Sequence, residues 1–257
     1  SSSGNLIFLL VGFFNGIAIG AGVVTGKHFG AGDNENLKKS IHTTIVFGVI
    51  CGMILTVVGI AAAPKILVLM GTPAEVLPES LSYFRVYFAG SLAFVMYNFF
   101  VGILQAMGDS KHPLFFLIIS SITNIVLDLV FVGIFRMGVW SAALATIISQ
   151  FLSAFLCLYQ LKKGNGVFQL QLSEIRGDTN MLRQIVINGV PAGVQNSIIS
   201  VANVFVQAHI NTFGATAVAG CGSYSKIEGF GFLPVTCFAL ALTTFISQNL
   251  GAREYER

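Results

Sequence analysis

Charged residues are scarce in this sequence. They make up 10% of its 257 residues, whereas a typical soluble domain contains about 25%. So little charge cannot cover a globule with a surface compatible with water, which excludes an ordinary soluble protein. The net charge is only +3, so binding to nucleic acid is not expected. The cysteines lack C-x-x-C spacing, so a disulfide or zinc framework is not expected. The sequence has no Ser-His-Asp order and no phosphate-binding glycine loop, so no motif indicates an enzyme.

Long apolar runs take the place of the missing charge. The sequence is 54% apolar with a mean hydropathy of +0.81, and a helix needs about 20 mostly apolar residues to span a bilayer. Kinks are expected in the last two runs, at Gly189-Val190-Pro191 and between Gly229 and Pro234. The predicted fold class is all-α, a polytopic membrane protein with about seven transmembrane helices. The runs are 5–26, 41–63, 81–106, 113–135, 138–160, 184–213 and 215–249.

Lysine and arginine are distributed unevenly between the two faces of this predicted bundle. One face carries only Lys65 and Arg136 between the runs. Positive residues concentrate on the cytoplasmic side of membrane proteins. We therefore expect the chain to begin outside the cell and its C-terminal end to be cytoplasmic. The residues on the predicted cytoplasmic face are Lys27, Lys38, Lys39, Lys111, Lys162, Lys163, Arg176, Arg183, Arg253 and Arg257.

One long polar stretch, 161–183, separates five runs from two. It is predicted to be a cytoplasmic linker between an N-terminal bundle, 1–160, and the start of a C-terminal bundle, 184–257. A short repeat also relates 28–35 to 249–256, where Gly, Ala and acidic residues coincide at an offset of 221. Repeats of this kind build many transporters. If 221 is the repeat length, the chain is expected to be a fragment with further helices on both sides.

Asp128 is the most informative of the charged residues inside the runs. It lies near the centre of 113–135, and Asn124 lies four residues earlier on the same helical face. A carboxylate at that depth is costly unless it faces a cavity or a partner. The pair is therefore a candidate binding site for H⁺ or Na⁺. The alternative is a hydrogen bond that only holds helices together.

Other polar residues within the runs are candidates for lining a cavity. Asn196, Asn203 and Gln207 are spaced by seven and four residues, which is one face of a helix. Hydrogen bonds between helices would explain this pattern equally well. A cavity with aromatic rings and few charges suits lipophilic cations. The remaining candidates for the cavity or for coupling are Asn98, Gln105, Arg85, Lys226 and Glu228, of which Arg85 can also extend to the membrane surface.

Several motifs resemble those of the multidrug and toxic compound extrusion (MATE) transporters. In chain order they are Gly30-Ala31-Gly32-Asp33, Gly108 to Pro113, Asn124 to Asp128, Gly138 to Gln150 and Ser247 to Ala252. The resemblance implies helices two to eight of twelve, arranged as two six-helix bundles around a central cavity. It implies export of small lipophilic cations across a prokaryotic plasma membrane, by a monomer surrounded by lipid. It also implies coupling to inward flow of protons or sodium, with no other cofactor.

The resemblance extends to the candidate site. Asn124 and Asp128 match the Asn-x-x-x-Asp pair that contributes to the cation site on helix five of proton-coupled prokaryotic members. The acid that such members carry on helix one would precede residue 1. Sodium-coupled members carry an acid on helix seven, whereas this chain has Gln195 and Asn196 near Pro191.

Two other functions agree with parts of the pattern. A flippase of the same superfamily, moving lipid-linked sugars, would need clustered Arg and Lys to bind phosphates, and only Arg85 and Lys226 lie within the runs. A retinal-type seven-helix protein would use Lys226 for a Schiff base. Its acidic counter-ion would be expected on the third run, whereas Asp128 is on the fourth.

Overall fold

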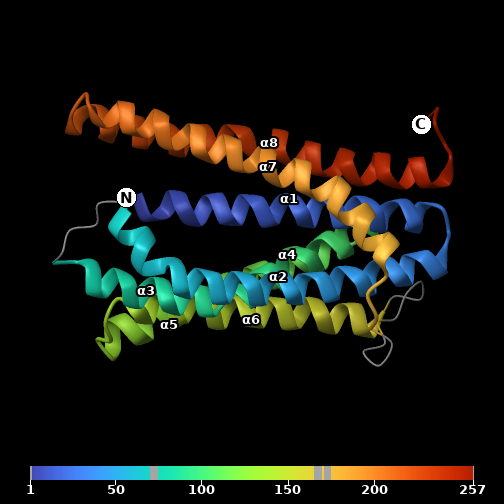
Figure 1. Ribbon diagram of the computed structural model, residues 1–257, viewed down its shortest axis with the longest axis horizontal. Coiled ribbons are helices and arrows are strands. Elements are labelled where there is room, and N and C mark those ends of the chain that lie inside the picture. The colour runs from blue at the N-terminus through green and yellow to red at the C-terminus, as the bar shows by residue number, and fades with distance from the viewer. Residues whose placement is uncertain (1, 70–74, 165–169, 171–174, 257) are drawn as a thin grey trace.

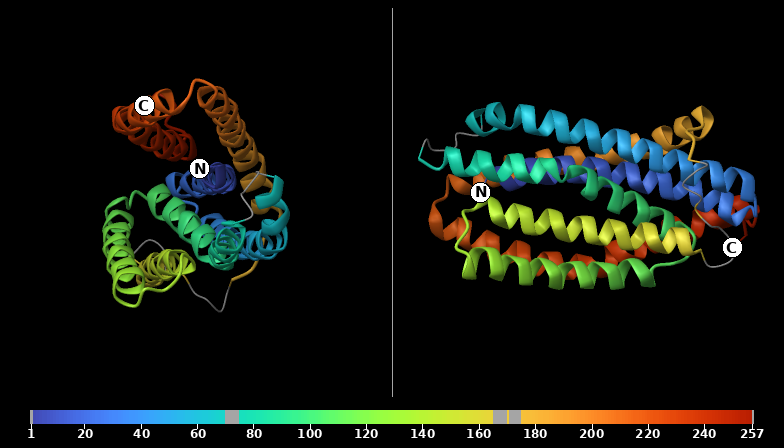
Figure 2. Two further views of the ribbon diagram at one scale, coloured as in Figure 1. Left: turned by 90° about the vertical axis from the view of Figure 1, so that its left-hand side faces the viewer. Right: turned by 90° about the horizontal axis from the view of Figure 1, so that it is seen from below.

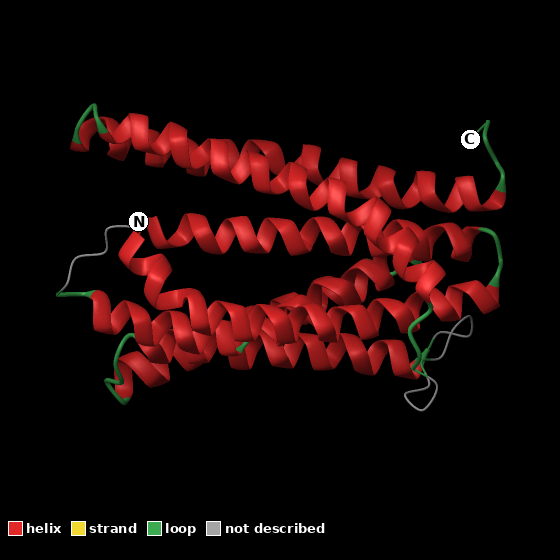
Figure 3. Ribbon diagram, in the orientation of Figure 1, coloured by secondary structure: helices red, strands yellow, loops and turns green. Residues whose placement is uncertain are grey.

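The computed structural model describes residues 2–69, 75–164, 170 and 175–256, and these residues are almost entirely helical. Every predicted run coincides with one or two helices to within a few residues, and no strand occurs in the described ranges (Figure 3), so the all-α class is confirmed. The elements are α1 (Ser2–Gly30), α2 (Asn34–Leu69), α3 (Leu77–Ala89), α4 (Ser91–Ala106), α5 (Lys111–Asp128), the π-helical segment η1 (Leu129–Ile134), α6 (Trp140–Lys163), α7 (Thr179–Asn211) and α8 (Ala215–Ala252).

Five helices within the described residues are long and apolar enough to cross a membrane. They are α2, α5 with η1, α6, α7 and α8, and the bent pair α3 and α4 makes a sixth if it counts as one span. The first predicted run lies in α1, where the side chains of residues 2–11 are outside the described part. Because α1 has 29 residues, its length of about 44 Å exceeds the hydrocarbon core of a bilayer.

The third run, predicted as one continuous segment, is bent at Gly90. Helices α3 and α4 meet there at 44°. The Gly90 N–H donates to the Tyr87 carbonyl at 3.1 Å, and a Cβ added at Gly90 would overlap the side chain of Ile147 on α6. The absence of a side chain at Gly90 therefore lets α6 pack against the corner of the bend.

Helix α1 lies between the α7–α8 pair and the helices α2 and α4 (Figures 1 and 2). Glycines allow its close approach to α7, because a Cβ on Gly16 would overlap the backbone of Gly193, and a Cβ on Gly20 would overlap that of Gly189. Small residues at such crossings are the usual way in which membrane helices pack. Thr25 of α1 and Ser40 of α2 share a buried hydrogen bond of 3.1 Å on the other side.

The C-terminal ends of α1 and α8 have the same backbone hydrogen bonds. After α1, the Asp33 N–H donates to the His28 carbonyl at 3.1 Å, and after α8, the Glu254 N–H donates to the Asn249 carbonyl at 3.0 Å. Both pairs are related by the offset of 221. This bond, which returns to a carbonyl in the last turn, is typical of a Schellman cap. The short sequence repeat therefore coincides with a repeated backbone geometry.

Arg253 has a backbone conformation that favours glycine. Its φ is 60°, and the equivalent residue after α1 is Gly32, with φ of 65°. A residue with a side chain costs about 1 kcal/mol in this conformation. We expect Arg253→Gly to raise the midpoint of thermal unfolding of the purified full-length protein. Arg253→Ala, which removes the same charge but keeps a side chain, should not raise this midpoint. Equal midpoints for the two variants would contradict the prediction.

The same two helix ends pack directly against each other. A Cβ on Gly30 would overlap the Gln248 carbonyl, and a Cβ on Gly251 would overlap the Lys27 carbonyl. The offset of 221 exchanges these two contacts, so they have the form of a two-fold interface. Gln248 Nε2 also donates to the Ala106 carbonyl at 2.7 Å, which attaches α8 to the end of α4. We refer to the contact of Lys27, Gly30, Gln248 and Gly251 as the helix-end clasp.

Candidate functional site

Asp128 lies at a change of helix type. It is the last residue of α5, and the π-helical segment η1 follows immediately. Such segments are rare and occur frequently at functional sites. The sequence of η1 is apolar and gave no signal for this geometry, so only the structure reveals it.

Asn124 lies one turn before Asp128 and reaches α6. Its Nδ2 is 3.5 Å from Thr146 Oγ1, at the outer limit of a hydrogen bond. Thr146 Oγ1 itself donates to the Ala142 carbonyl at 3.0 Å. Thr146 was not among the predicted site residues, because a threonine that bonds its own helix leaves no distinctive pattern in a sequence.

Asp128 presents a buried oxygen without a partner. Its Oδ1 is buried and accepts no hydrogen bond from the residues that the structure describes. Tyr83 of α3, which was not predicted either, is near enough to interact with it electrostatically. A buried carboxylate oxygen is unfavourable unless a proton, a cation or water interacts with it. We refer to Tyr83, Asn124, Asp128 and Thr146 as the candidate cation site.

These contacts bear on the alternative that the Asn124–Asp128 pair only holds helices together. A structural hydrogen bond stabilises most at donor–acceptor distances of about 2.7–3.2 Å, and the Asn124–Thr146 contact is longer. The unpartnered oxygen of Asp128 contributes no such bond within the described residues. Within the described residues, neither side chain therefore makes a short hydrogen bond between helices.

A cavity of about 790 Å³ lies between α1, α7 and α8. It is lined by four of the predicted residues, Asn196, Asn203, Gln207 and Glu228, of which the first three come from α7. Asn196 Nδ2 donates to the Gly12 carbonyl of α1 at 3.1 Å, so this amide also joins two helices. Polar residues of this cavity that were not predicted are Asn15, Ser200 and Ser225.

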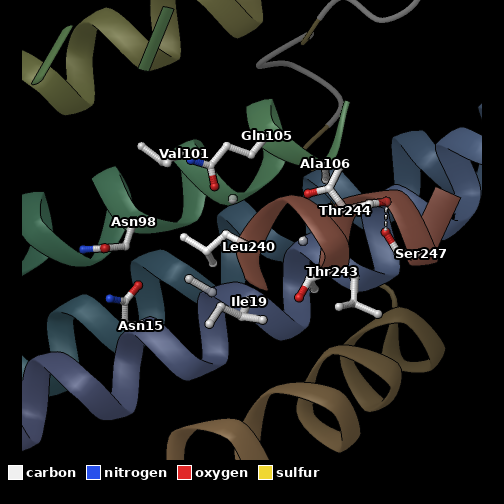
Figure 4. Close-up of a pocket in the computed structure, with 14 residues that line it drawn as sticks. Asn15, Ile19, Asn98, Val101, Gln105, Ala106, Leu240, Thr243, Thr244 and Ser247 are labelled. Atoms are coloured by element: carbon white, nitrogen blue, oxygen red, sulfur yellow. Dashed lines mark hydrogen bonds between the residues drawn. The ribbon is translucent and has the colours of Figure 1, made fainter. Parts of the chain in front are cut away.

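A second cavity, of about 160 Å³, lies between α1, α4 and α8 (Figure 4). The predicted residues Asn98 and Gln105 line it from α4, and Thr243 and Thr244 line it from α8. Asn15 of α1 lines both cavities. The amides that the sequence singled out are therefore divided between two neighbouring spaces.

Two of the residues predicted for a cavity or for coupling, Arg85 and Lys226, are not placed in these cavities. The side chain of Arg85 is exposed on α3, and Arg85 is not among the residues lining either space. Lys226 is in α8, but its side chain lies outside the described part of the chain.

Comparison with known proteins agrees with the resemblance seen in the sequence. The family model MatE matches residues 1–130 and 191–257. The chain is 30% identical to the "Probable multidrug resistance protein YoeA" of Bacillus subtilis (strain 168), over 98% of this chain and 56% of that protein. It is 25% identical to the "Probable multidrug resistance protein YpnP" of the same strain, over 99% and 57%.

A solved structure has the same arrangement of helices. It is the outward-facing conformation of a multidrug resistance MATE family transporter of the MOP superfamily, with a TM-score of 0.89 at 25% identity, over 98% of this chain and 56% of that one. The chain thus spans a little over half the length of the relatives that it matches. Because the family model matches well over half of its residues, this chain belongs to the MatE family.

Proposed function

We propose that the full-length protein is a cation-coupled exporter of small lipophilic cations, working by alternating access as a secondary transporter. The observation that carries this proposal is the buried Oδ1 of Asp128, which accepts no hydrogen bond within the described residues. Asn124 lies one turn away and contacts Thr146, and Tyr83 interacts electrostatically with Asp128. Binding of a proton or cation removes a buried charge. The charged and neutral forms should then favour different helix arrangements, and this difference is the coupling.

The coupling ion is H⁺ or Na⁺. A proton needs only the carboxylate of Asp128, whereas sodium would use its oxygens together with those of Asn124 and Thr146. The three residues come from α5 and α6, which both belong to the proposed N-terminal bundle, 1–160. Residues 161–183 would link this bundle to the beginning of a C-terminal bundle, 184–257.

The larger cavity is the proposed binding space for the cargo. Its volume of about 790 Å³ is in the range of small-molecule sites. Glu228 supplies a negative charge for a cationic cargo, and the described lining contains no Arg or Lys. This lining does not suit the phosphates of lipid-linked sugars. Membership of the MatE family likewise favours transport over a retinal-type function.

The helix-end clasp is the proposed closed side of the transporter. It joins the ends of α1 and α8 at which two of the predicted cytoplasmic charges, Lys27 and Arg253, lie. The larger cavity is lined by Gly12 and Glu228, from the opposite halves of these helices. We infer that the cavity faces outward and the clasp closes the cytoplasmic side of a prokaryotic plasma membrane. The similarity to an outward-facing relative supports this orientation.

Dye efflux from proteoliposomes containing the full-length protein tests the proposed function. Ethidium export is expected under an inward gradient of protons or of sodium, and should cease when an ionophore dissipates that gradient. Addition of ATP without a gradient serves as the control and should not restore export. Export that continues undiminished without either ion gradient would contradict cation coupling.

A further inference from the structure

We propose that a groove between α2 and the start of α7 binds phosphatidylethanolamine, a phospholipid whose headgroup combines a primary ammonium with a phosphate. The inference concerns the lipid bound at the protein surface and does not depend on transport. The start of α7 crosses α2 at this place (Figure 1). We refer to the space as the lipid groove, defined by Thr43, Val46, Phe47, Ile50, Asp178 and Leu182.

Hydrogen bonds fix the polar end of the lipid groove. The Asp178 N–H donates to Thr43 Oγ1 at 2.9 Å, which joins the residue before α7 to the buried side of α2. Asp178 Oδ1 accepts from the Met181 N–H at 2.9 Å and so caps α7. These two bonds hold the Asp178 carboxylate in place beside α2.

The lipid groove extends from headgroup level into the hydrocarbon of the membrane. The apolar run predicted for α2 begins at residue 41, so Thr43 and the adjoining Asp178 lie near its polar edge. Ile50 lies about 10 Å further along α2, and 45% of its surface is exposed. Side chains exposed at this depth contact lipid. The groove is therefore open to lipid along its length.

The size and walls of the lipid groove suit part of an acyl chain. Its volume is about 150 Å³, and an apolar cavity of that size holds benzene, so about six carbons fit. Val46, Phe47 and Leu182 form apolar walls between the polar end and Ile50. A lipid can thus place the upper part of one chain in the groove with its headgroup beside Asp178.

The charges at the polar end match a headgroup that carries both signs. Asp178 is the only charged residue in the described lining. A carboxylate has about four acceptor sites, so its cap bond leaves room for an ammonium group. The phosphate has basic partners beside the groove, since Arg176 is exposed next to Gly177. Lys39 is near enough to Asp178 for their charges to interact, and it also pairs with Glu35 at 2.6 Å.

This arrangement distinguishes phosphatidylethanolamine from other common phospholipids. Phosphatidylcholine carries the same two charges, but its quaternary ammonium has no N–H to donate to Asp178. Phosphatidylglycerol has no positive group to place against the carboxylate. A primary ammonium forms charge-assisted hydrogen bonds with a carboxylate, which are stronger than neutral ones. The lipid groove therefore favours the primary amine.

Native mass spectrometry of the purified full-length protein tests the proposal. Phosphatidylethanolamine competes in pairs with phosphatidylcholine and with phosphatidylglycerol, all carrying the same acyl chains. The unaltered protein should bind its first phosphatidylethanolamine about tenfold more tightly than either competitor, the effect of a charge-assisted hydrogen bond. Asp178→Asn should reduce this preference below about twofold. Asparagine caps a helix as well as aspartate does, so the midpoint of thermal unfolding should not change.

Two further variants locate the site. Asp109→Asn changes another acid at the start of a helix, whose Oδ1 accepts from the His112 N–H at 3.2 Å, and should keep the preference. Gly177→Leu fills the mouth of the groove and should weaken binding of the first lipid of each kind. Equal binding of the three lipids, a preference that persists in Asp178→Asn, or unchanged binding in Gly177→Leu would overturn the proposal. No cargo or ion gradient is present, so failure here is distinct from failure of gradient-driven efflux.

Discussion

Asp128→Asn should abolish the dependence of dye export on the ion gradient. Asparagine keeps the size of the side chain but can neither take up a proton as a carboxylate does nor provide a negative charge for sodium. The ion would then no longer favour one helix arrangement over the other, and its gradient could not drive transport. Gradient-driven export should fall about 5- to 150-fold, the range typical of coupling free energies between sites.

This prediction is measured as ethidium efflux from proteoliposomes at several pH values and sodium concentrations. Glu79→Gln is the matched control, because it neutralises an exposed acid in the first turn of α3. The buried Asp128 Oδ1 has no partner within the described residues, so its replacement should not lower the midpoint of thermal unfolding. Unchanged gradient dependence in a folded Asp128→Asn protein would remove the role assigned to this residue.

Gly251→Ala should prevent closure of the helix-end clasp. Even a single Cβ at this position would overlap the Lys27 carbonyl, which belongs to the rigid backbone of α1. Overpacking of this kind costs about 1–3 kcal/mol. Because only the clasped state carries that cost, the equilibrium between helix arrangements should shift away from it by about 5- to 150-fold. Export, which requires both states, should fall accordingly.

Accessibility of Ser247 distinguishes a shifted equilibrium from misfolding. Ser247 is buried next to the clasp, and a Ser247→Cys protein should react slowly with a water-soluble maleimide. Adding Gly251→Ala should accelerate this reaction. Ala252→Leu, at the exposed neighbouring position, should leave both labelling and export unchanged. If Gly251→Ala alters neither the labelling rate of Ser247→Cys nor export, the clasp is not the closed side of the transporter.

Much of the fold could be predicted because a membrane imposes strong constraints. The apolar runs corresponded to helices, since a chain in lipid must satisfy its backbone hydrogen bonds internally. The bend at Gly90 and the π-helical segment after Asp128 could not be predicted. Both lie in apolar sequence, where contacts with neighbouring helices decide the backbone geometry. A glycine within a run signals a bend only when the residue packed against it, here Ile147, is known.

The candidate site was only partly predictable for the same reason. Asn124 and Asp128 stand out because buried polar residues in an apolar run are costly. Thr146 and Tyr83 do not, since a threonine can bond its own helix and a tyrosine can pack as an apolar ring. Their relation to Asp128 depends on how α3 and α6 lie against α5.

The sequence by itself determined the membrane class, the positions of the helices, the repeat offset and the likeness to MATE transporters. These properties follow from composition, spacing and short motifs, which are local along the chain. Only the tertiary structure decided which polar residues meet. It places the predicted cavity amides in two cavities that share Asn15. It also brings the two copies of the repeat into direct contact, with Gly30 against Gln248 and Gly251 against Lys27. Such contacts depend on how helices distant in sequence cross, and small residues permit that crossing without specifying its partner.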